Sequence, residues 1–337
     1  MSTTVRTAPA DADLFDPRRL ATTQSGSDRA FVLVSRSVAA VVLVITGGIG
    51  LFLAKSFVPT LAHYGLGFFT ERQWQPEADV LGIAAVLAGT ITVATVALLI
   101  AFPLSLLTAL YIAEYAPARL RATFVSLVDL MAAVPSIIYG LWGFTLISPH
   151  ASGFAHWLHV HLGWVPFFRV DADPDAAAWE QTRYTASAFI AGIAVAMMVV
   201  PMACAVMQQV FSQAPAGERE AAFALGATHW GVVRTVVLPF GRGGIIGGTM
   251  LGLGRALGET IAVLLIISPS FDLKLRPLEV GTNTISALIA GRFGEATSTQ
   301  LQALLAAGFV LFMITLAINT LASMVVARSR SGQGAEG

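Results

Sequence analysis

Six long apolar runs constrain the fold of this chain more than any other feature. They lie at about Val38–Phe57, Ile83–Ile112, Ala122–Ile147, Ala186–Phe211, Gly243–Ser268 and Leu301–Val326. About 20 apolar residues suffice for a helix to cross the hydrocarbon core of a bilayer. Charged residues make up only 12% of the chain, against about 25% in soluble domains. The sequence therefore predicts an all-α, polytopic membrane protein with six transmembrane helices.

An even number of spans places both termini on one side of the membrane, and the Arg and Lys residues indicate which side. Twelve of them lie in segments 1–36, 114–121, 212–242 and 328–337, whereas seven lie in the loops on the other side. By the positive-inside rule, the richer side is cytoplasmic. We therefore expect a multi-pass protein of the cell membrane with both termini in the cytoplasm.

The termini themselves contain no apolar core. Residues 1–29 combine several Asp residues with Pro, Thr and Ser, a composition typical of a disordered tail and unlike a signal peptide. The expected organisation is a tail of residues 1–29, a transmembrane domain of residues 30–327 and a second tail of residues 328–337.

Residues 212–240 form a polar insertion between the fourth and fifth apolar runs. Pro215 and the acidic residues after it suit the first turn of a helix, where a missing amide donor and the positive dipole end favour them. Gly226 permits a sharp turn. A second helix should follow and stop at Pro239, because proline breaks the backbone hydrogen-bond pattern.

The spacing of this insertion is specific. Glu220-Ala221-Ala222 is followed by Gly226 and then by Val236-x-Leu238-Pro239, and the pattern resembles the EAA loop of ABC importer permeases. In that family the loop is a cytoplasmic coupling helix seated in a groove of the ATPase. The resemblance implies a type I ABC importer (MetI-like) permease core. It also implies that ATPase coupling depends on Glu220, Ala221, Ala222, Gly226, Leu238 and Pro239; the alternative is an ordinary amphipathic connector.

Two further segments narrow the resemblance. Pro135-Ser136-Ile137-Ile138-Tyr139-Gly140 and Gly254-Arg255-Ala256-Leu257-Gly258-Glu259-Thr260 look like segments of phosphate-specific permeases of the PstC type. This resemblance implies a permease subunit that forms half of the pathway of an ATP-driven phosphate importer. Its implied partners are a PstA-type permease, two PstB-type ATPase subunits and an outer PstS-type phosphate-binding protein. ATP and magnesium would belong to the ATPase, so this chain would carry no cofactor and would not be an enzyme.

Arg255 and Glu259 lie four residues apart in the fifth apolar run. At 100° per residue they share one helical stripe with Gly244, Gly248, Leu251 and Gly252. An arginine in a membrane span is costly unless it is paired or hydrated. We expect Arg255 to offer a transient site to passing phosphate and Glu259 to keep that site from binding too tightly. The alternative is a static clasp between helices.

Ser136 and Tyr139 are three residues apart after Pro135, so both hydroxyls can point to one side of the third span. A lining of the substrate pathway is one interpretation. The other is that Ser136 bonds the backbone freed by Pro135 while Tyr139 packs inside the protein. Asp129, earlier in the same span, is expected to be an interfacial or interhelical partner.

Several functional classes receive no support. The net charge is zero, so no nucleic-acid partner is implied. His156, His159 and His161 cannot converge on one metal from a helix, and no catalytic or nucleotide-binding motif is present. A permease for another oxyanion such as sulfate, and an ion-driven secondary transporter, remain as alternatives; membrane lipid surrounds the chain in each case.

Overall fold

The structure is a computed structural model that describes residues 26–170 and 184–330. It divides into two compact units, residues 1–49 and residues 50–337. The first described helix, α1 (Gly26–Tyr64), begins in the first unit and ends in the second. The tail expected at residues 1–29 lies outside the described residues up to residue 25, and residues 26–29 are already helical.

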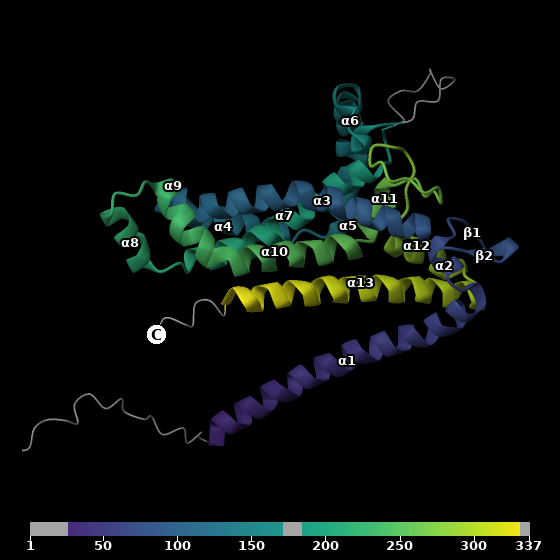
Figure 1. Ribbon diagram of the computed structural model, residues 1–337, viewed down its shortest axis with the longest axis horizontal. Coiled ribbons are helices and arrows are strands. Elements are labelled where there is room, and N and C mark those ends of the chain that lie inside the picture. The colour runs from purple at the N-terminus through teal and green to yellow at the C-terminus, as the bar shows by residue number, and fades with distance from the viewer. Residues whose placement is uncertain (1–25, 171–183, 331–337) are drawn as a thin grey trace, which may run out of the picture. The chain divides into compact units, whose positions relative to one another are not determined.

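Helices dominate the second unit (Figure 1). The elements after α1 are α2 (Gly67–Thr70), β1 (Trp74–Gln75), η1 (Pro76–Ala78), β2 (Val80–Leu81), α3 (Ala84–Leu110), η2 (Tyr111–Tyr115), α4 (Ala118–Ala132), α5 (Ser136–Trp142), η3 (Gly143–Ile147), α6 (Ser148–Leu162) and η4 (Pro166–Phe168). They continue with α7 (Ala188–Ser212), α8 (Ala216–Ala224), α9 (His229–Val232), η6 (Val233–Val237), α10 (Leu238–Gly258), α11 (Ile261–Ile266), α12 (Ile285–Arg292), η7 (Phe293–Glu295) and α13 (Ser298–Arg330).

The predicted all-α membrane architecture is confirmed. Within the described residues, five helices are long and apolar enough to span a bilayer, and a sixth span is obtained when one bent pair of helices is counted as one. The five are Gly26–Tyr64, Ala84–Tyr115, Ala188–Ser212, His229–Gly258 and Ser298–Val326. Every predicted apolar run overlaps one of these six.

The third predicted span is not a continuous helix. Ala118–Ala132 and the helix that begins at Ser136 meet at 87°. Proline removes a donor and disfavours helical geometry in the residue before it, so the break falls just before Pro135. The second helix then continues to Leu162, beyond Ile147, where the third predicted apolar run ends.

Pro239 does not end a helix, contrary to the prediction. The structure continues helically from His229 to Gly258. The π-helical turn of residues 233–237 comes directly before Leu238 and Pro239. A π turn widens the helix and changes which amide and carbonyl groups pair, so a proline can follow without losing the helical path.

Helix α7 lies at the centre of the packing and contacts α3, α4 and α10. Figure 1 shows α3, α7 and α10 side by side, with α8 and α9 at one end and α11 and α12 at the other. Close approach depends on glycine, since a side chain at Gly192 of α7 would overlap Val96 of α3. Small residues that allow such close contact are typical of helix pairs in membranes.

The connection from α1 to α3 is closed by a small antiparallel hairpin in which Trp74 pairs with Leu81. Asp79, with a φ of 53°, turns the chain between the strands. Its carboxylate accepts a hydrogen bond from Tyr64 at 2.7 Å and lies 2.9 Å from His63 Nε2. These contacts lower the pKa of the Asp79 carboxyl, the Tyr64 hydrogen bond most strongly.

Candidate functional site

Arg255 lies in the last turn of α10, beside the buried glycine seam rather than within it. Gly248 and Gly252 are buried and face α7, where added side chains would overlap the Ala203 carbonyl and Val199. Arg255 itself is exposed, and it makes no hydrogen bond or ion pair with any residue that the structure describes. The sequence predicted that Arg255 and the glycines share one face of the helix. In the structure they lie on two faces: the glycine seam is packed against α7, and the neighbouring face that carries Arg255 is exposed.

Glu259 is not on the helix that carries Arg255, which corrects the predicted geometry. Helix α10 ends at Gly258, and Glu259 has an extended conformation with ψ 125°. Its Oε1 atom accepts a hydrogen bond from the amide of Ala262 at 3.2 Å, and its side chain is buried. The carboxylate thus satisfies an amide at the start of α11, where the helix dipole favours a negative charge. The structure gives no ion pair between Glu259 and Arg255 among the described residues.

Tyr139 is buried and its hydroxyl points to the backbone. It donates a hydrogen bond to the carbonyl of Met131 at 2.8 Å, and its ring lies edge-on to Trp142. Ser136 is half-buried and makes no hydrogen bond with a described residue. The tyrosine hydroxyl is therefore occupied at the bend between α4 and α5.

A buried polar segment, residues 282–286, was not singled out from the sequence. Its buried polar members are Thr282, Asn283, Thr284 and Ser286. The hydroxyl of Ser286 donates to the carbonyl of Glu259 at 2.8 Å, and the amide of Ile285 donates to Thr90 of α3 at 3.0 Å. A side chain at Gly89 would overlap the Asn283 backbone. The sequence signal that could have identified this segment is its polarity, since four of its five residues are polar in an otherwise apolar chain.

At the opposite end of the bundle, α8 closes with the turn that the sequence predicted at Gly226. This residue has a φ of 83°. Its amide donates to Phe223, and the amide of Ala227 donates to Ala222 at 3.0 Å, which is the hydrogen-bond pattern of a Schellman motif. A β-carbon added at Gly226 would meet no atom of a neighbouring segment within 4 Å, so glycine is required here by the backbone conformation and not by crowding within the chain.

The same end of the chain presents exposed apolar side chains. Leu225 is 90% exposed, Trp230 57% and Phe223 40%. Glu220 is exposed and unpaired among the described residues, Ala221 is exposed, and Ala222, Leu238 and Pro239 are partly buried. Exposed large apolar groups next to an acidic side chain are typical of a surface that another protein covers.

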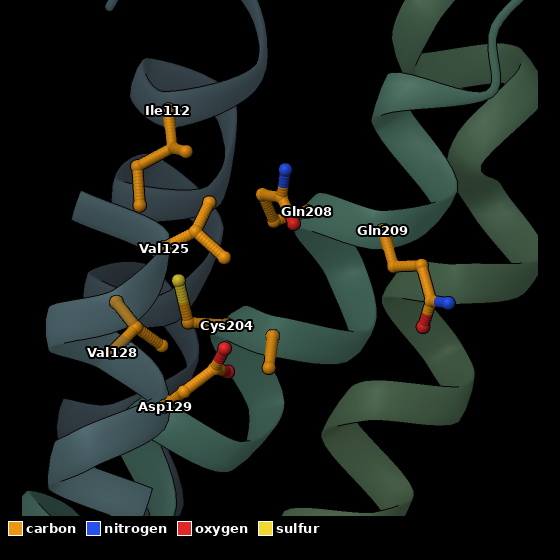
Figure 2. Close-up of a pocket in the computed structure, with 8 residues that line it drawn as sticks. Ile112, Val125, Val128, Asp129, Cys204, Gln208 and Gln209 are labelled. Atoms are coloured by element: carbon orange, nitrogen blue, oxygen red, sulfur yellow. The ribbon is translucent and has the colours of Figure 1, made fainter. Parts of the chain in front are cut away.

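A cavity between α4 and α7 lies near this end (Figure 2). The cavity has a volume of about 330 Å³ and is lined by Ile112, Val125, Val128, Asp129, Cys204, Ala205, Gln208 and Gln209. Figure 2 shows the Asp129 carboxylate of α4 beside Cys204 of α7. Asp129 was expected to be an interfacial or interhelical partner; it makes no ion pair with a described residue, and its side chain lines the cavity.

Sequence comparison identifies relatives over almost the whole chain. The family model described as binding-protein-dependent transport system inner membrane component matches residues 101–331. The phosphate transport system permease protein PstC of Xylella fastidiosa is 36% identical over 327 residues, which cover 97% of this chain and 96% of that protein. The phosphate transport system permease protein PstC 2 of Mycobacterium tuberculosis is 35% identical over 311 residues, covering 90% of this chain and 93% of that protein.

Structural comparison supports the same assignment at the level of the fold. A bacterial ABC transporter that imports the acidic polysaccharide alginate matches with a TM-score of 0.55 and 19% identity, covering 89% of this chain and 96% of that chain. The alginate transporter in complex with its pentasaccharide-bound periplasmic protein matches with a TM-score of 0.58 and 20% identity, covering 89% and 95%. The importer permease fold predicted from the EAA-like loop is thereby confirmed. From the family match and these relatives together, the chain belongs to the family of binding-protein-dependent transport system inner membrane components.

Proposed function

We propose that this chain is the permease subunit of an ATP-driven importer of inorganic phosphate and that it forms half of the translocation pathway. The observation that carries the proposal is the 36% identity to a phosphate permease along 97% of this chain. The proposed organisation is one permease domain, residues 30–327, flanked by tails at residues 1–29 and 328–337. The chain itself would hold no cofactor and catalyse no reaction.

The segment 212–240 is proposed to couple this permease to a separate ATPase. The exposed Leu225 and Phe223 supply apolar contact area, and the exposed Glu220 supplies a charge for a basic partner residue. A short helix laid into a groove is a common mode of protein recognition. The proposed partners are two PstB-type ATPase subunits that bind ATP and magnesium, a PstA-type permease and an outer PstS-type binding protein.

The proposed orientation rests on the distribution of the basic residues. The α8 end of the bundle carries Arg119, Arg121, Arg219 and Arg234 and is proposed to face the cytoplasm together with both termini. Single cysteines in a Cys204→Ser background test this assignment in intact cells. A cysteine replacing Leu66, in the turn before α2, should react with an impermeant thiol reagent, whereas one replacing Gly217 should not; the reverse labelling would overturn the orientation.

Arg255 is proposed to be the positive group that phosphate meets in this subunit. Its exposed guanidinium has no partner among the described residues, and a cation at that depth is stable only if it faces water or another protein. A guanidinium matches two oxygens of a phosphate at once. Glu259, Ser136 and Tyr139 are proposed to shape the same pathway, Glu259 by setting the end of α10 and by limiting how tightly an anion is held.

Competition between anions tests the substrate assignment. The complete transporter, reconstituted in liposomes with its binding protein outside and ATP inside, should take up labelled phosphate. A tenfold excess of unlabelled phosphate should suppress that uptake, and the same excess of sulfate should not. Equal suppression by sulfate would favour the alternative of a permease for another oxyanion.

A further inference from the structure

Arg219 of α8 contacts the ends of two membrane spans at once. Its Nη2 atom lies 3.0 Å from Glu114 Oε1, in the π turn that ends the α3 span. The same atom donates a hydrogen bond to the carbonyl of Phe211, at the end of α7, at 2.7 Å. The side chain of Glu114 is 8% exposed and that of Arg219 is 22% exposed. Both charges are thus largely removed from solvent, where an ion pair is screened far less than at a surface.

A second arginine in the chain has the same local setting without the ion pair. Ala116-Pro117-Ala118-Arg119-Leu120-Arg121 and Ala214-Pro215-Ala216-Gly217-Glu218-Arg219 share the pattern Ala-Pro-Ala-x-x-Arg. Arg121 donates a hydrogen bond to the carbonyl of Ala113 at 2.8 Å, eight residues back, as Arg219 does to Phe211. Arg121 makes no ion pair with a described residue. Capping the end of the preceding span therefore does not require an acidic partner, and Glu114 adds a separate contact that only α8 receives.

This added contact joins α8 to a helix that runs the length of the bundle. Helix α3 begins near the buried polar segment, where Thr90 accepts a hydrogen bond from the amide of Ile285. Its span ends in η2, where Glu114 meets Arg219. Helix α3 also packs along α7 and α10. A displacement of its end would therefore be transmitted along a packed helix and not through a loop.

We propose that Glu114 and Arg219 are positioning residues that transmit movement of α8 to α3, and through α3 to the polar segment 282–286, which contacts Glu259 through Ser286. This inference rests on the proposed role of α8 as the ATPase contact. Without the ion pair, α8 would still follow α7 through the Phe211 carbonyl, but α3 would no longer be driven with it. ATP hydrolysis would then continue while transport fell behind.

The test is a double-mutant cycle in the reconstituted transporter, read as phosphate imported per ATP hydrolysed. Glu114→Gln and Arg219→Gln should each lower this ratio by about 5-fold or more, within the range typical of coupling between sites. The double variant should be no worse than either single variant, because all three lack the same contact. The swapped pair, Glu114→Arg with Arg219→Glu, should recover part of the ratio lost in each single reversal.

Arg121→Gln is the matched control, since it removes the equivalent backbone hydrogen bond and no ion pair. It should leave the imported-to-hydrolysed ratio within twofold of the parent. Glu114→Asp, which keeps the charge on a shorter side chain, serves if Glu114→Gln gives too little assembled complex. A normal ratio in Glu114→Gln or Arg219→Gln, or strictly multiplicative losses in the double variant, would overturn the inference.

The parent complex keeps this result separate from the proposed function. If the parent imports phosphate and the Glu114 variants do so at the normal ratio, only the inference fails. If the parent does not import phosphate, the proposed function fails, and the same variants are then compared by how strongly the binding protein stimulates ATP hydrolysis. Loss of that stimulation in Glu114→Gln and Arg219→Gln, but not in Arg121→Gln, supports the inference, and its retention contradicts it.

Discussion

The hydroxyl of Tyr139 donates a hydrogen bond to the carbonyl oxygen of Met131, 2.8 Å away, across the bend between α4 and α5. The last carbonyls of a helix have no partner within that helix. At a bend of 87° in a membrane span, no regular helix follows to shield them. Tyr139, which follows the break, therefore stabilises the bend, and its side chain helps to set the bent shape of the third predicted span.

Tyr139→Phe tests whether this residue holds the bend or lines the pathway. The ring should keep its contact with Trp142, while the Met131 carbonyl loses the tyrosine hydroxyl and keeps the amide of Val134, 3.3 Å away, as a donor. We expect a loss of about 0.5–1.5 kcal/mol in stability, the net contribution of one hydrogen bond, seen as a lower thermal midpoint in detergent. Loss of phosphate uptake with an unchanged midpoint would instead favour a pathway role for the hydroxyl.

Arg255→Gln tests the proposed anion contact in α10. Phosphate uptake should fall about tenfold or more, because a hydrogen bond to a charged group contributes about 1.5–3 kcal/mol and 1.4 kcal/mol corresponds to a factor of ten. Stability should change little, since Arg255 has no partner among the described residues. Assembly, thermal midpoint and uptake are measured on the same preparations.

The double variant Arg255→Gln with Glu259→Gln distinguishes this account from a static clasp. If the two residues formed a buried pair in the assembled transporter, Arg255→Gln alone would cost about 3–5 kcal/mol and the double variant would recover stability and transport. Because Glu259 instead caps α11 through Ala262, we expect no recovery of transport.

Gly226→Leu tests the turn between α8 and α9. A residue with a β-carbon at a φ of 83° is strained, by about 1–2 kcal/mol for ordinary residues. Leucine should therefore distort the end of α8 and lower ATPase stimulation and transport together while membrane insertion persists. Gly226→Asn, which tolerates this conformation better, should retain more of both activities, and Gly217→Ala, on the same helix, is the neutral control. Full activity of Gly226→Leu would contradict the coupling role of the loop.

How far the sequence predicts this molecule depends on the kind of feature. Hydropathy located the spans because every segment that crosses lipid must be apolar and must pair its own backbone polar groups. Proline gave an ambiguous signal: Pro135 marks a sharp break, whereas the helix passes Pro239 after a π turn. That difference depends on backbone pairing around each proline and not on the residue itself.

The site shows a similar division. The sequence singled out Arg255 because a charge in an apolar run is conspicuous. The sequence analysis misplaced Glu259, because helical spacing does not indicate that α10 ends at Gly258. The contact between Glu114 and Arg219 joins residues 105 positions apart and depends on the packing of α3 against α7. Such a long-range pair cannot be derived from local periodicity.

The glycine seam between α10 and α7 gives a stability prediction with an internal control. A β-carbon at Gly244 would lie 2.6 Å from Val210 Cβ, whereas one at Gly247 would meet no atom within 4 Å. Gly244→Ala should therefore lower stability by about 1–3 kcal/mol through overpacking. Gly247→Ala should be neutral or raise it by up to about 1 kcal/mol, because alanine favours the helix. Equal thermal midpoints for the two variants would show that the seam tolerates a wider separation.

The most direct test of the proposed function is the initial rate of phosphate uptake into liposomes that contain the complete transporter, with the binding protein outside. We expect uptake that requires ATP on the α8 side, stops when ADP replaces ATP, and is unaffected when proton and sodium gradients are abolished. Uptake that persists without ATP and follows an ion gradient would contradict the proposed function and identify a secondary transporter.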